Sequence, residues 1–370
     1  MKILVTGGAG FIGSHLVDAL VKQGHAVRVL DNLEEQVHEG KKPSYLNSNA
    51  EYLWGDVRDV AMLRKALAGI EVVFHEAASV GVGQSMYQIE KYVSANSLGT
   101  AVLLNTLVND RIPIKKLIVA SSMSIYGEGA YRCSGCGPVF PSLRPEDQLK
   151  RHEWEMTCPQ CFQPVAAEPT SEEKPLIPTS VYAVVKRDQE ELCLCVGRSY
   201  HIPTVALRYF NVYGPRQALS NPYTGVCAIF SSRIKNNHSP LVFEDGLQSR
   251  DFIHVSDIIK ANLLVMQNPK ADYGILNVGG GRPVSVLEIT QTLIDLYRMD
   301  VKPQLVQKYR AGDIRHCYAD VSKMRALGFQ AAVSLKDGLR ELAEWGKGVP
   351  AQDRVDAATR ELEAYGLTQG

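Results

Sequence analysis

The feature that most constrains the fold is a strand that runs directly into a glycine-rich turn and then into a helix. The segment KILVTGGAGFIGSHL, residues 2–16, begins with a short apolar run and continues with apolar residues at helical spacing. Between the two runs lie Gly7, Gly10 and Gly13. Small residues there let the backbone approach a pyrophosphate, and the helix N-terminus supplies free N–H groups. This context predicts a dinucleotide-binding turn, for which the alternative is a packing turn without a ligand.

Strand-like and helix-like segments then alternate over more than half of the chain. Short apolar runs such as HAVRVLDN, EVVFHEAA and KKLIVASS indicate buried strands, whereas residues 92–110 and 181–200 carry apolar residues at helical spacing. Strands that alternate with helices form parallel sheets covered on both faces. We therefore predict an α/β fold built on a Rossmann-type doubly wound parallel sheet.

A chain of 370 residues is long enough for more than one lobe. We assign residues 1–210, where strands and helices alternate, to the nucleotide-binding domain. Proline, glycine and asparagine become frequent over residues 211–333, where we expect a smaller substrate-binding lobe. Residues 334–370 look like a charged helical extension. Residues 128–175 have few periodic apolar residues, so we interpret them as an insertion into the first domain.

Acidic residues follow two of the predicted strands. Asp31 ends the second strand, 18 residues after Gly13. A carboxylate at this place accepts hydrogen bonds from the ribose hydroxyls of NAD and repels the additional phosphate of NADP. Asp56 and Val57 in GDVRD follow another strand, where an adenine ring could lie, although an ordinary strand-to-helix turn is the alternative. These residues predict NAD as the cofactor.

A candidate catalytic group is formed by Tyr182, Lys186 and the serines near the end of the KKLIVASS strand. Tyr182 and Lys186 are four residues apart in a predicted helix, which places both side chains on one face. A nearby ammonium would favour the phenolate and lower the pKa of the tyrosine. Ser121, Ser122 and Ser124 follow the strand to the carboxyl edge of the sheet, where ligands of such sheets bind. The tyrosine–lysine pair alone could arise by chance in any helix.

Together these motifs resemble those of the extended short-chain dehydrogenase/reductases that act on nucleotide sugars. The resemblance covers about residues 1–330 outside the insertion, with TGGAGFIGSHL, GDVRD, FHEAA, NSLGT, SSMSIYG, YAVVK, RYFNVYGP, RDFIHVSD and RAGDIRHCYAD in the family's order. It implies tightly held NAD and a smaller nucleotide-sugar lobe. It also implies a homodimer, in which helices near 92–109 and 181–200 pair as a four-helix bundle.

The resemblance assigns roles to individual residues. Tyr182 is expected to be the base, Lys186 to hold the nicotinamide ribose and Ser122 to bind the reacting sugar hydroxyl. Val185 departs from the family, which often has serine before the lysine, and we expect this change to affect packing more than chemistry. The expected cofactor-binding residues are Gly7, Gly10, Phe11, Ile12, Gly13, Asp31, Asn32, Asp56, Val57, Ala77, Ala78, Asn96, Tyr182 and Lys186.

The residues that follow Ser122 narrow the expected reaction. Family members that remove water carry aspartate and glutamate there, and members that remove carbon dioxide keep the glutamate. Met123 and Ser124 occupy these positions here, and neither side chain can perform that proton transfer at neutral pH. We therefore expect NAD-dependent 4-epimerisation of a nucleotide sugar through a transient 4-keto intermediate.

The expected substrate-binding residues lie mainly in the second half of the chain. Guanidinium groups bind phosphate oxygens bidentately, so arginines of the smaller lobe are candidates for a pyrophosphate anchor, with salt bridges inside the lobe as the alternative. The expected set is Ser122, Ser124, Asn211, Phe243, Arg250 and Arg310. The loop SVGVGQSM lacks the arginine with which epimerases of uronic acids often pair a carboxylate, which favours a sugar with an uncharged C6.

The segments VGVGQSMYQIEKY and NPYTGVCAIFSSR, together with the cysteines of the insertion, are similar to those of the dTDP-L-rhamnose 4-epimerase group. This similarity implies dTDP-L-rhamnose and dTDP-6-deoxy-L-talose as the substrate pair. The alternatives are an epimerase or oxidoreductase of the UDP-glucose/UDP-galactose type, and a protein of the same fold that binds NAD or RNA without catalysis.

Four of the eight cysteines form two CxxC pairs in the insertion. Cys133 and Cys136 are separated from Cys158 and Cys161 by 21 residues. Two such turns can present four thiolates to one tetrahedral ion, which predicts a structural zinc site; iron or disulfides are the alternatives. Four thiolates leave no open position on the metal, so we expect the metal to stabilise the segment rather than take part in the reaction.

The balance of charges limits the possible partners. Lys and Arg together number 40, as do Asp and Glu, which argues against a general nucleic-acid or membrane-surface binder. No run approaches the 18 consecutive apolar residues typical of a transmembrane helix. We expect a cytoplasmic protein whose partners are a nucleotide-sugar substrate and a second copy of the chain.

Overall fold

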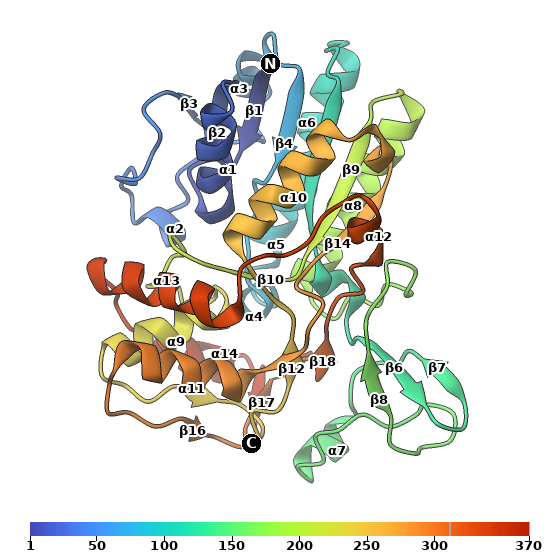
Figure 1. The fold of residues 1–370 in the computed structure, drawn as a ribbon, viewed down its shortest axis with the longest axis vertical. Coiled ribbons are helices and arrows are strands. Elements are labelled where there is room, and N and C mark those ends of the chain that lie inside the picture. The colour runs from blue at the N-terminus through green and yellow to red at the C-terminus, as the bar shows by residue number, and fades with distance from the viewer. Residues whose placement is uncertain (311, 370) are drawn as a thin grey trace.

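The computed structural model describes residues 1–310 and 312–369, and a parallel sheet lies at its centre (Figure 1). Each strand of this sheet pairs in parallel with its neighbours, in the order β14-β9-β5-β4-β1-β2-β3. This arrangement confirms the predicted Rossmann-type doubly wound fold. The strands are β1 (Lys2–Thr6), β2 (Ala26–Asp31), β3 (Glu51–Trp54), β4 (Val72–His75), β5 (Lys116–Ser122), β9 (Thr204–Tyr209) and β14 (Ile275–Val278).

Helices cover both faces of the sheet, because each strand sends apolar side chains alternately to the two sides. On one face, Leu16 and Ile258 pack against apolar side chains of the sheet. On the other face, Leu63, Leu103 and Leu194 do so. The first face carries α1 (Phe11–Lys22), α10 (Val255–Gln267) and α12 (Ser322–Ala326). The second face carries α3 (Val60–Leu67), α6 (Gly99–Asn109) and α8 (Val181–Ser199).

Short elements lie near the carboxyl ends of the central strands. Ser122 begins a 3₁₀ turn, Met123–Tyr126, and a π-helical segment, Val93–Leu98, leads into α6. The remaining short helices of this lobe are α2 (Glu35–His38), α4 (Val82–Ser85) and α5 (Ile89–Tyr92).

The smaller lobe is built on three helices, α9 (Val226–Lys235), α11 (Val286–Tyr297) and α13 (Leu335–Gly348), which share one apolar core. Its short strands are β10 (Asn211–Tyr213), β11 (Leu241–Val242), β12 (Ser249–Arg250), β13 (Phe252–His254), β15 (Val284–Ser285), β16 (Gln304–Leu305), β17 (Tyr309–Arg310) and β18 (His316–Cys317). The C-terminal segment adds α14 (Val355–Ala364) and β19 (Thr368–Gln369), which pairs with β17.

A single boundary at residue 210 would mean that the chain passes from the first lobe to the smaller lobe once. In the structure the chain returns to the first lobe after residue 210. Residues 211–333 were expected in the smaller lobe, but α10 packs on α1 and β14 extends the central sheet beside β9. The sequence ILNV of β14 is short and follows a loop rich in turn residues, so its pattern does not distinguish a central strand from a strand of the smaller lobe.

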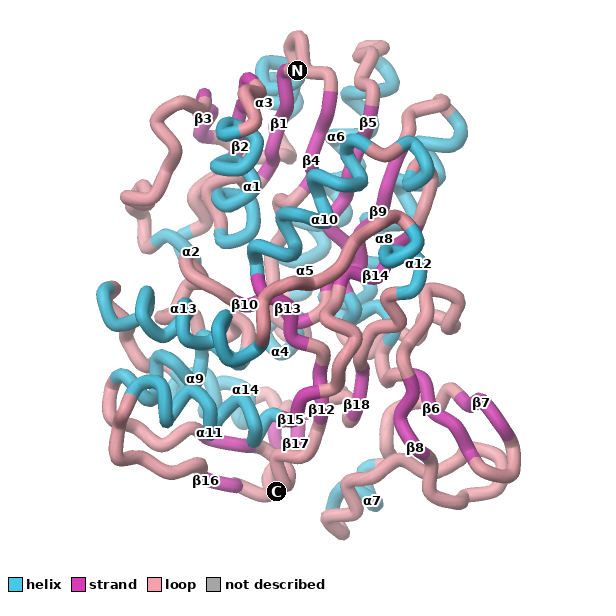
Figure 2. The backbone as a smooth tube through the Cα atoms, in the orientation of Figure 1, coloured by secondary structure: helices cyan, strands magenta, loops and turns pink. Residues whose placement is uncertain are grey.

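The insertion protrudes beside the smaller lobe and consists mostly of loops (Figure 2). Strands β6 (Ala130–Cys133), β7 (Gly137–Val139) and β8 (Ala166–Glu168) form an antiparallel sheet with β6 in the centre, and α7 (Glu146–Lys150) is a separate short helix. Its apolar cluster has only five fully buried members, namely Tyr131, Cys133, Val139, Met156 and Cys158. A core of this size provides little burial, so the segment needs an additional constraint to hold its shape.

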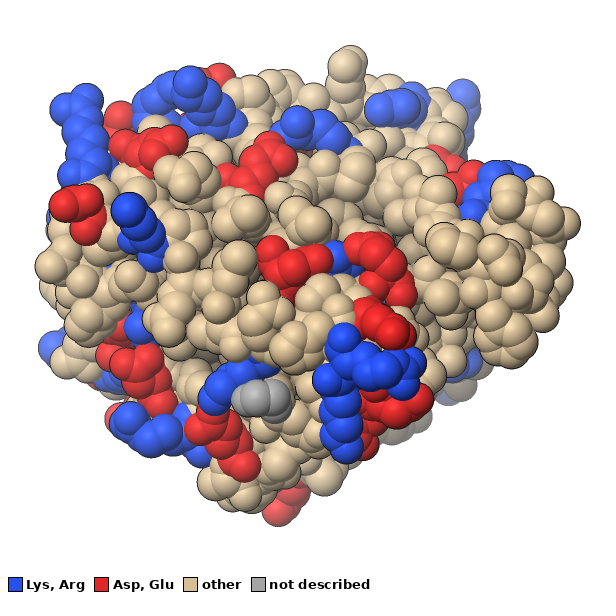
Figure 3. Space-filling model, turned by 90° about the horizontal axis from the view of Figure 1, so that it is seen from below, with Lys and Arg blue, Asp and Glu red and all other residues tan. Residues whose placement is uncertain are grey.

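The surface shows no sign of charge segregation on the face seen from below. Figure 3 shows acidic and basic side chains interspersed over this face. Among the helices of the described residues, none is both long enough and apolar enough to cross a bilayer.

Candidate active site

The glycine turn between β1 and α1 forms a cradle of backbone atoms at the carboxyl edge of the sheet. Gly7 has a φ of +69°, and a Cβ atom there would lie 2.9 Å from the backbone nitrogen of Ala77. A Cβ atom on Gly13 would overlap the carbonyl oxygen of Gly7. Gly10 caps α1, which begins with Phe11 and Ile12. A cradle without side chains at a helix N-terminus fits the pyrophosphate of a dinucleotide.

Asp31 and Asp56 lie at the ends of neighbouring strands, next to this cradle. The Asp31 carboxylate accepts hydrogen bonds from the backbone N–H of Ala9 at 2.9 Å and of Leu33 at 2.8 Å. Asn32 donates to Asp56 at 3.0 Å, and the hydrogen bond from Arg58 lowers the pKa of Asp56 to about 2. Asp31 is thus an oriented carboxylate at the end of β2, as a ribose-binding residue requires.

The loop after β4, which contains Ala77 and Ala78, is held by Asn96. Asn96 is fully buried, accepts a hydrogen bond from the backbone N–H of Ser79 at 2.7 Å and donates to the Ser79 carbonyl at 3.1 Å. Asn96 therefore fixes the shape of the loop that contains Ala77 and Ala78, next to the predicted cofactor cleft.

Tyr182 lies in the first turn of α8, where two serines fix the backbone. The hydroxyl of Ser180 caps the helix by accepting from the N–H of Ala183, and the hydroxyl of Ser85 accepts from the N–H of Tyr182 at 3.0 Å. Burial raises the pKa of Tyr182 to about 12, while a hydrogen bond with Ser122 acts in the opposite direction. Ser124 donates to the Ser122 hydroxyl at 3.0 Å, so both predicted serines meet at the end of β5.

Lys186 is buried one turn further along α8. Its ammonium donates to the Ala120 carbonyl and, at 2.9 Å, to the side-chain oxygen of Gln189. Burial lowers the pKa of Lys186 to about 8, against the opposing effect of Glu76. The expectation that Lys186 lowers the pKa of Tyr182 is not what the structure shows, because the burial of the phenol dominates and raises that pKa.

The sequence did not indicate the hydrogen-bond chain behind Lys186. Gln189 donates to Thr100 at 2.8 Å, and Thr100 is 2.9 Å from the ring of His75, whose other nitrogen is 2.9 Å from Thr6. Burial lowers the pKa of His75 to about 3, so the ring is neutral. The position of Gln189, three residues after Lys186 on the same helix, is the one signal in the sequence that could have revealed it.

Glu76 is a second residue that the sequence left without a role. It follows β4, and its carboxyl group accepts a hydrogen bond from the Tyr209 hydroxyl at 2.9 Å. Burial raises the pKa of Glu76 to about 7. The glutamate beside His75 in the strand end FHEAA was the available signal.

In the smaller lobe the structure brings Arg310 and Phe243 together. The Arg310 guanidinium lies over the Phe243 ring, 4.1 Å from its centroid, and its buried Nε has no hydrogen-bond partner among the described residues. The Asn211 side-chain oxygen is likewise buried and unpaired within that part of the chain. Arg250 donates to the carbonyls of Ser249, Ile314 and Arg315 rather than to a carboxylate. Among the described residues, therefore, neither arginine forms the salt bridge that was its alternative interpretation.

The four cysteines of the insertion converge on one point. Their sulfur atoms all lie within 4.8 Å of one another, and none of them forms a disulfide. Zn–S bonds of about 2.3 Å in a tetrahedron place sulfur atoms roughly 3.8 Å apart. The cluster therefore has the donor set and approximate dimensions of a four-thiolate metal site.

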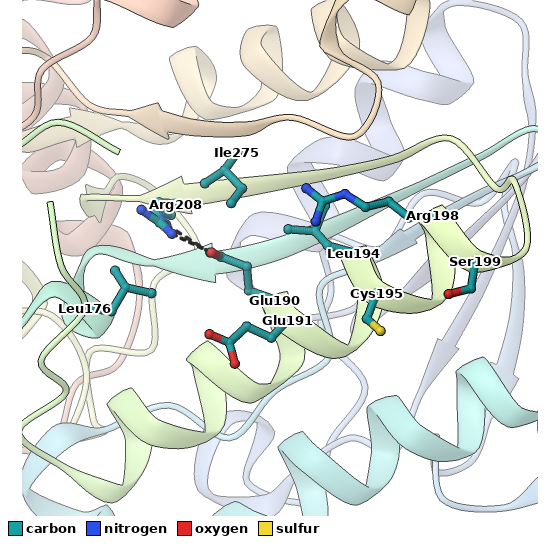
Figure 4. Close-up of a pocket in the computed structure, with 9 residues that line it drawn as sticks. All are labelled: Leu176, Glu190, Glu191, Leu194, Cys195, Arg198, Ser199, Arg208 and Ile275. Atoms are coloured by element: carbon teal, nitrogen blue, oxygen red, sulfur yellow. Dashed lines mark hydrogen bonds and ion pairs between the residues drawn. The ribbon is translucent and has the colours of Figure 1, made fainter. Parts of the chain in front are cut away.

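A separate hollow lies along the second half of α8, away from Tyr182 (Figure 4). Its floor contains the buried ion pair between Glu190 and Arg208, at 2.6 Å, and Ser121 donates to the same glutamate. This pair joins α8 to β5 and β9 and so helps to fix the helix that carries Tyr182 and Lys186. No predicted site residue lines the hollow.

The profile of the NAD dependent epimerase/dehydratase family matches residues 3–144 and 157–279. The chain belongs to this family. The break in the match falls within the insertion. The membership confirms the resemblance to extended short-chain dehydrogenase/reductases that was drawn from the sequence.

Among individual relatives in the family, a dTDP-L-rhamnose 4-epimerase of Burkholderia thailandensis is 32% identical over 93% of this chain and 94% of that protein. A putative UDP-glucose 4-epimerase of Methanocaldococcus jannaschii is 33% identical over 93% of this chain and 98% of that protein. The crystal structure of UDP-glucuronic acid 4-epimerase from Bacillus cereus, in complex with UDP-glucuronic acid and NAD, has a TM-score of 0.78. It is 30% identical and covers 94% of this chain and 99% of that one.

Proposed function

We propose that the protein is an NAD-dependent nucleotide-sugar 4-epimerase. The observation that carries the proposal is the arrangement of Ser122, Tyr182 and Lys186 at the carboxyl edge of the sheet, next to the glycine cradle. Met123 is buried and Ser124 is bound to Ser122, so neither provides the acid or base that dehydration requires.

In the proposed reaction Tyr182 accepts the proton of the sugar C4 hydroxyl on its phenolic oxygen, while Ser122 holds the same hydroxyl. Lys186, fixed by Ala120 and Gln189, provides a positive charge on the same helix face. The NAD held beside these residues would supply hydride transfer at C4, from one face of the sugar and back to the other, and Tyr182 returns its proton to the C4 oxygen in the second step. The cradle formed by Gly7, Gly10 and Gly13 and the Asp31 carboxylate would hold this cofactor.

Arg310, Arg250 and Asn211 are the proposed anchors of the substrate pyrophosphate, and Phe243 provides an aromatic surface beside Arg310. An anchor is needed because the keto sugar must turn while its nucleotide stays bound. The Nε of Arg310 and the side-chain oxygen of Asn211 are buried without a partner among the residues that the structure describes, which supports this role, since buried polar atoms are normally hydrogen-bonded.

For the sugar, we propose dTDP-L-rhamnose and dTDP-6-deoxy-L-talose. The relative of that activity supports this choice, as does the absence of arginine from residues 79–86. A UDP-glucose-type epimerase is the alternative, supported by the relative from M. jannaschii. The test is incubation of the purified protein with both sugar pairs, with the products resolved by NMR. If the protein converts neither sugar pair, the proposed 4-epimerase activity on these sugars is contradicted.

An oxidoreductase and a non-catalytic binding protein are two further alternatives, and incubation with nucleotide sugars would distinguish both from an epimerase. An oxidoreductase would need added NAD and would release NADH, whereas an epimerase retains its cofactor through purification and turns over without addition. A protein that binds NAD or RNA without catalysis would leave every nucleotide sugar unchanged.

The position of Asp31 predicts a preference for NAD over NADP. Its carboxylate is already fixed by two backbone N–H groups and would repel a phosphate on the ribose. Hydrogen bonds to charged groups contribute about 1.5–3 kcal/mol, which corresponds to at least about tenfold in affinity. Titration of cofactor-free protein measures this ratio, and equal affinities would refute the role of Asp31.

We propose a homodimer formed by α8 and the helical segments before and within α6. Val93, Leu98 and Val184 leave 43%, 49% and 52% of their surface exposed on these helices, although they are apolar. Burying such side chains in a helix bundle is favourable. We expect light scattering at micromolar concentration to give twice the mass of one chain, and a monomer there would contradict the proposal.

We also propose that Cys133, Cys136, Cys158 and Cys161 bind one structural zinc ion. Support comes from their convergence and from the small apolar core of the insertion. A site with four thiolates is closed, so the metal would stabilise the fold of the segment without contacting the substrate.

A further inference from the structure

A cluster of six charged side chains, four of them buried, joins the insertion to the smaller lobe. We call it the junction cluster; its members are Glu128, Arg144, Glu155, Glu244, Asp245 and Arg315. Glu128, Arg144 and Glu155 belong to the insertion, whereas the other three belong to the smaller lobe. None of the six has a role in the reaction proposed above.

Arg144 is one of the insertion residues that bind the smaller lobe. Its side chain is only 2% exposed and forms two hydrogen bonds to the Glu244 carboxylate, at 2.7 and 3.0 Å. It also donates to the carbonyls of Trp154, within the insertion, and Asp313, in the smaller lobe. A paired guanidinium and carboxylate of this geometry fix both position and orientation.

Arg315, in the smaller lobe, is the second arginine that joins the two parts of the junction cluster. Its side chain is fully buried and donates to Glu155 at 3.0 Å, Glu244 at 2.9 Å and Asp245 at 2.7 Å. Glu128 accepts from the backbone N–H groups of Arg315 at 2.7 Å and of His316 at 2.8 Å. Arg315 and the start of β18 are therefore hydrogen-bonded to the insertion through both backbone and side chain.

The segments held in this way carry the proposed nucleotide-binding side chains. Glu244 directly follows Phe243, and its N–H donates to the carbonyl of Lys308, two residues before Arg310. The carbonyl of Arg315 accepts a hydrogen bond from Arg250. Displacing Glu244 or Arg315 would thus move Phe243, Arg310 and Arg250, although within the described part of the chain none of these three forms a side-chain hydrogen bond or ion pair with a charged residue of the insertion.

We propose that Arg144 is a positioning residue for the nucleotide diphosphate, and that the insertion serves the enzyme by holding the nucleotide pocket in its binding shape. The inference rests on the proposed function in that it takes Phe243, Arg250 and Arg310 to bind the nucleotide part of the substrate. It assigns to the insertion a role in affinity, separate from the chemistry at Tyr182.

The test is Arg144→Met, which removes the charge and keeps the length of the side chain. Arg151→Met is the matched control, because Arg151 lies in the same insertion and its ion pairs within the described residues are with Asp147 and Glu153, both also in the insertion. Binding of dTDP and of UDP is measured by calorimetry on the NAD-loaded protein. We expect Arg144→Met to weaken nucleotide binding by about tenfold or more, since a buried charge pair is broken. NAD retention and kcat should be nearly unchanged while KM rises, and Arg151→Met should match the wild type.

A second variant covers the case in which Arg144→Met disturbs folding. Glu155 is exposed, with 61% of its side chain accessible, so Glu155→Gln should fold normally. An exposed pair contributes about 0.2–1 kcal/mol, so we expect nucleotide binding to weaken by a factor of roughly 1.4 to 5. Wild-type affinity in Glu155→Gln, or in a folded Arg144→Met, would overturn the inference.

The outcomes separate this inference from the proposed function. Wild-type protein that epimerises a nucleotide sugar while both variants bind dTDP and UDP normally would refute the role of the insertion alone. Protein that binds nucleotide and loses this binding in Arg144→Met, but converts no sugar, would support the inference and refute the epimerase. Wild-type protein that binds neither nucleotide would refute both.

Discussion

Tyr182→Phe is expected to lower the turnover number by about 10²- to 10⁴-fold, the usual contribution of a positioned acid–base group. The change removes only the phenolic oxygen from a side chain whose ring packs edge-on against Tyr92, with centroids 6.4 Å apart. The backbone of Tyr182 stays bound to Ser85. We therefore expect the variant to fold and to retain NAD, which the absorbance of the purified protein and its melting temperature would show.

Tyr200→Phe is the matched control, because Tyr200 follows the other end of α8 and is 57% exposed. It should keep wild-type activity. Activity of Tyr182→Phe within a few-fold of the wild type would remove Tyr182 from the mechanism.

The pH dependence of the wild-type enzyme provides an independent check on the same residue. Burial raises the pKa of Tyr182 to about 12, so the fraction of phenolate increases with pH throughout the neutral range. Burial lowers the pKa of Lys186 to about 8, so this side chain begins to lose its charge near that pH. The turnover number should rise with pH up to about 8, and Tyr182→Phe should lack this rise.

The parts of the site that the sequence predicted are those set by local structure. The glycine turn, the carboxylate at the end of β2 and the spacing of Tyr182 and Lys186 each depend on a few adjacent residues. Their positions follow once a strand or helix is identified. The same holds for the two CxxC turns, whose residue types and spacing already define a metal-binding pattern.

The parts that the sequence did not predict depend on contacts between distant residues. Arg144 and Glu244 are 100 positions apart, and no local pattern pairs them. The raised pKa of Tyr182 follows from its burial under several elements, which the four-residue spacing to Lys186 does not reveal. The place of β14 in the central sheet likewise depends on its pairing with β9.

Cys158→Ser is expected to release most of the metal and to loosen residues 128–175. The wild type should contain about one zinc per chain by metal analysis. Cys158 is fully buried in an apolar cluster of few residues, so the metal should contribute much of the stability of β6, β7 and the loops around the four cysteines. Limited proteolysis should therefore cut the variant within this segment while the rest of the chain stays intact. Cys195→Ser is the control, because Cys195 is exposed on α8 and remote from the cluster.

The functional effect of Cys158→Ser should fall on substrate binding. The core of the Rossmann lobe is built from the central strands and their covering helices, so NAD should remain bound. Arg144 and Glu155 lie in the loosened segment, so Glu244 and Arg315 should lose partners and the affinity for dTDP and UDP should fall. Suppose instead that zinc removal abolished turnover while the segment stayed resistant to protease and nucleotide affinity stayed unchanged. The metal would then act directly in the reaction, contrary to the closed four-thiolate site proposed here.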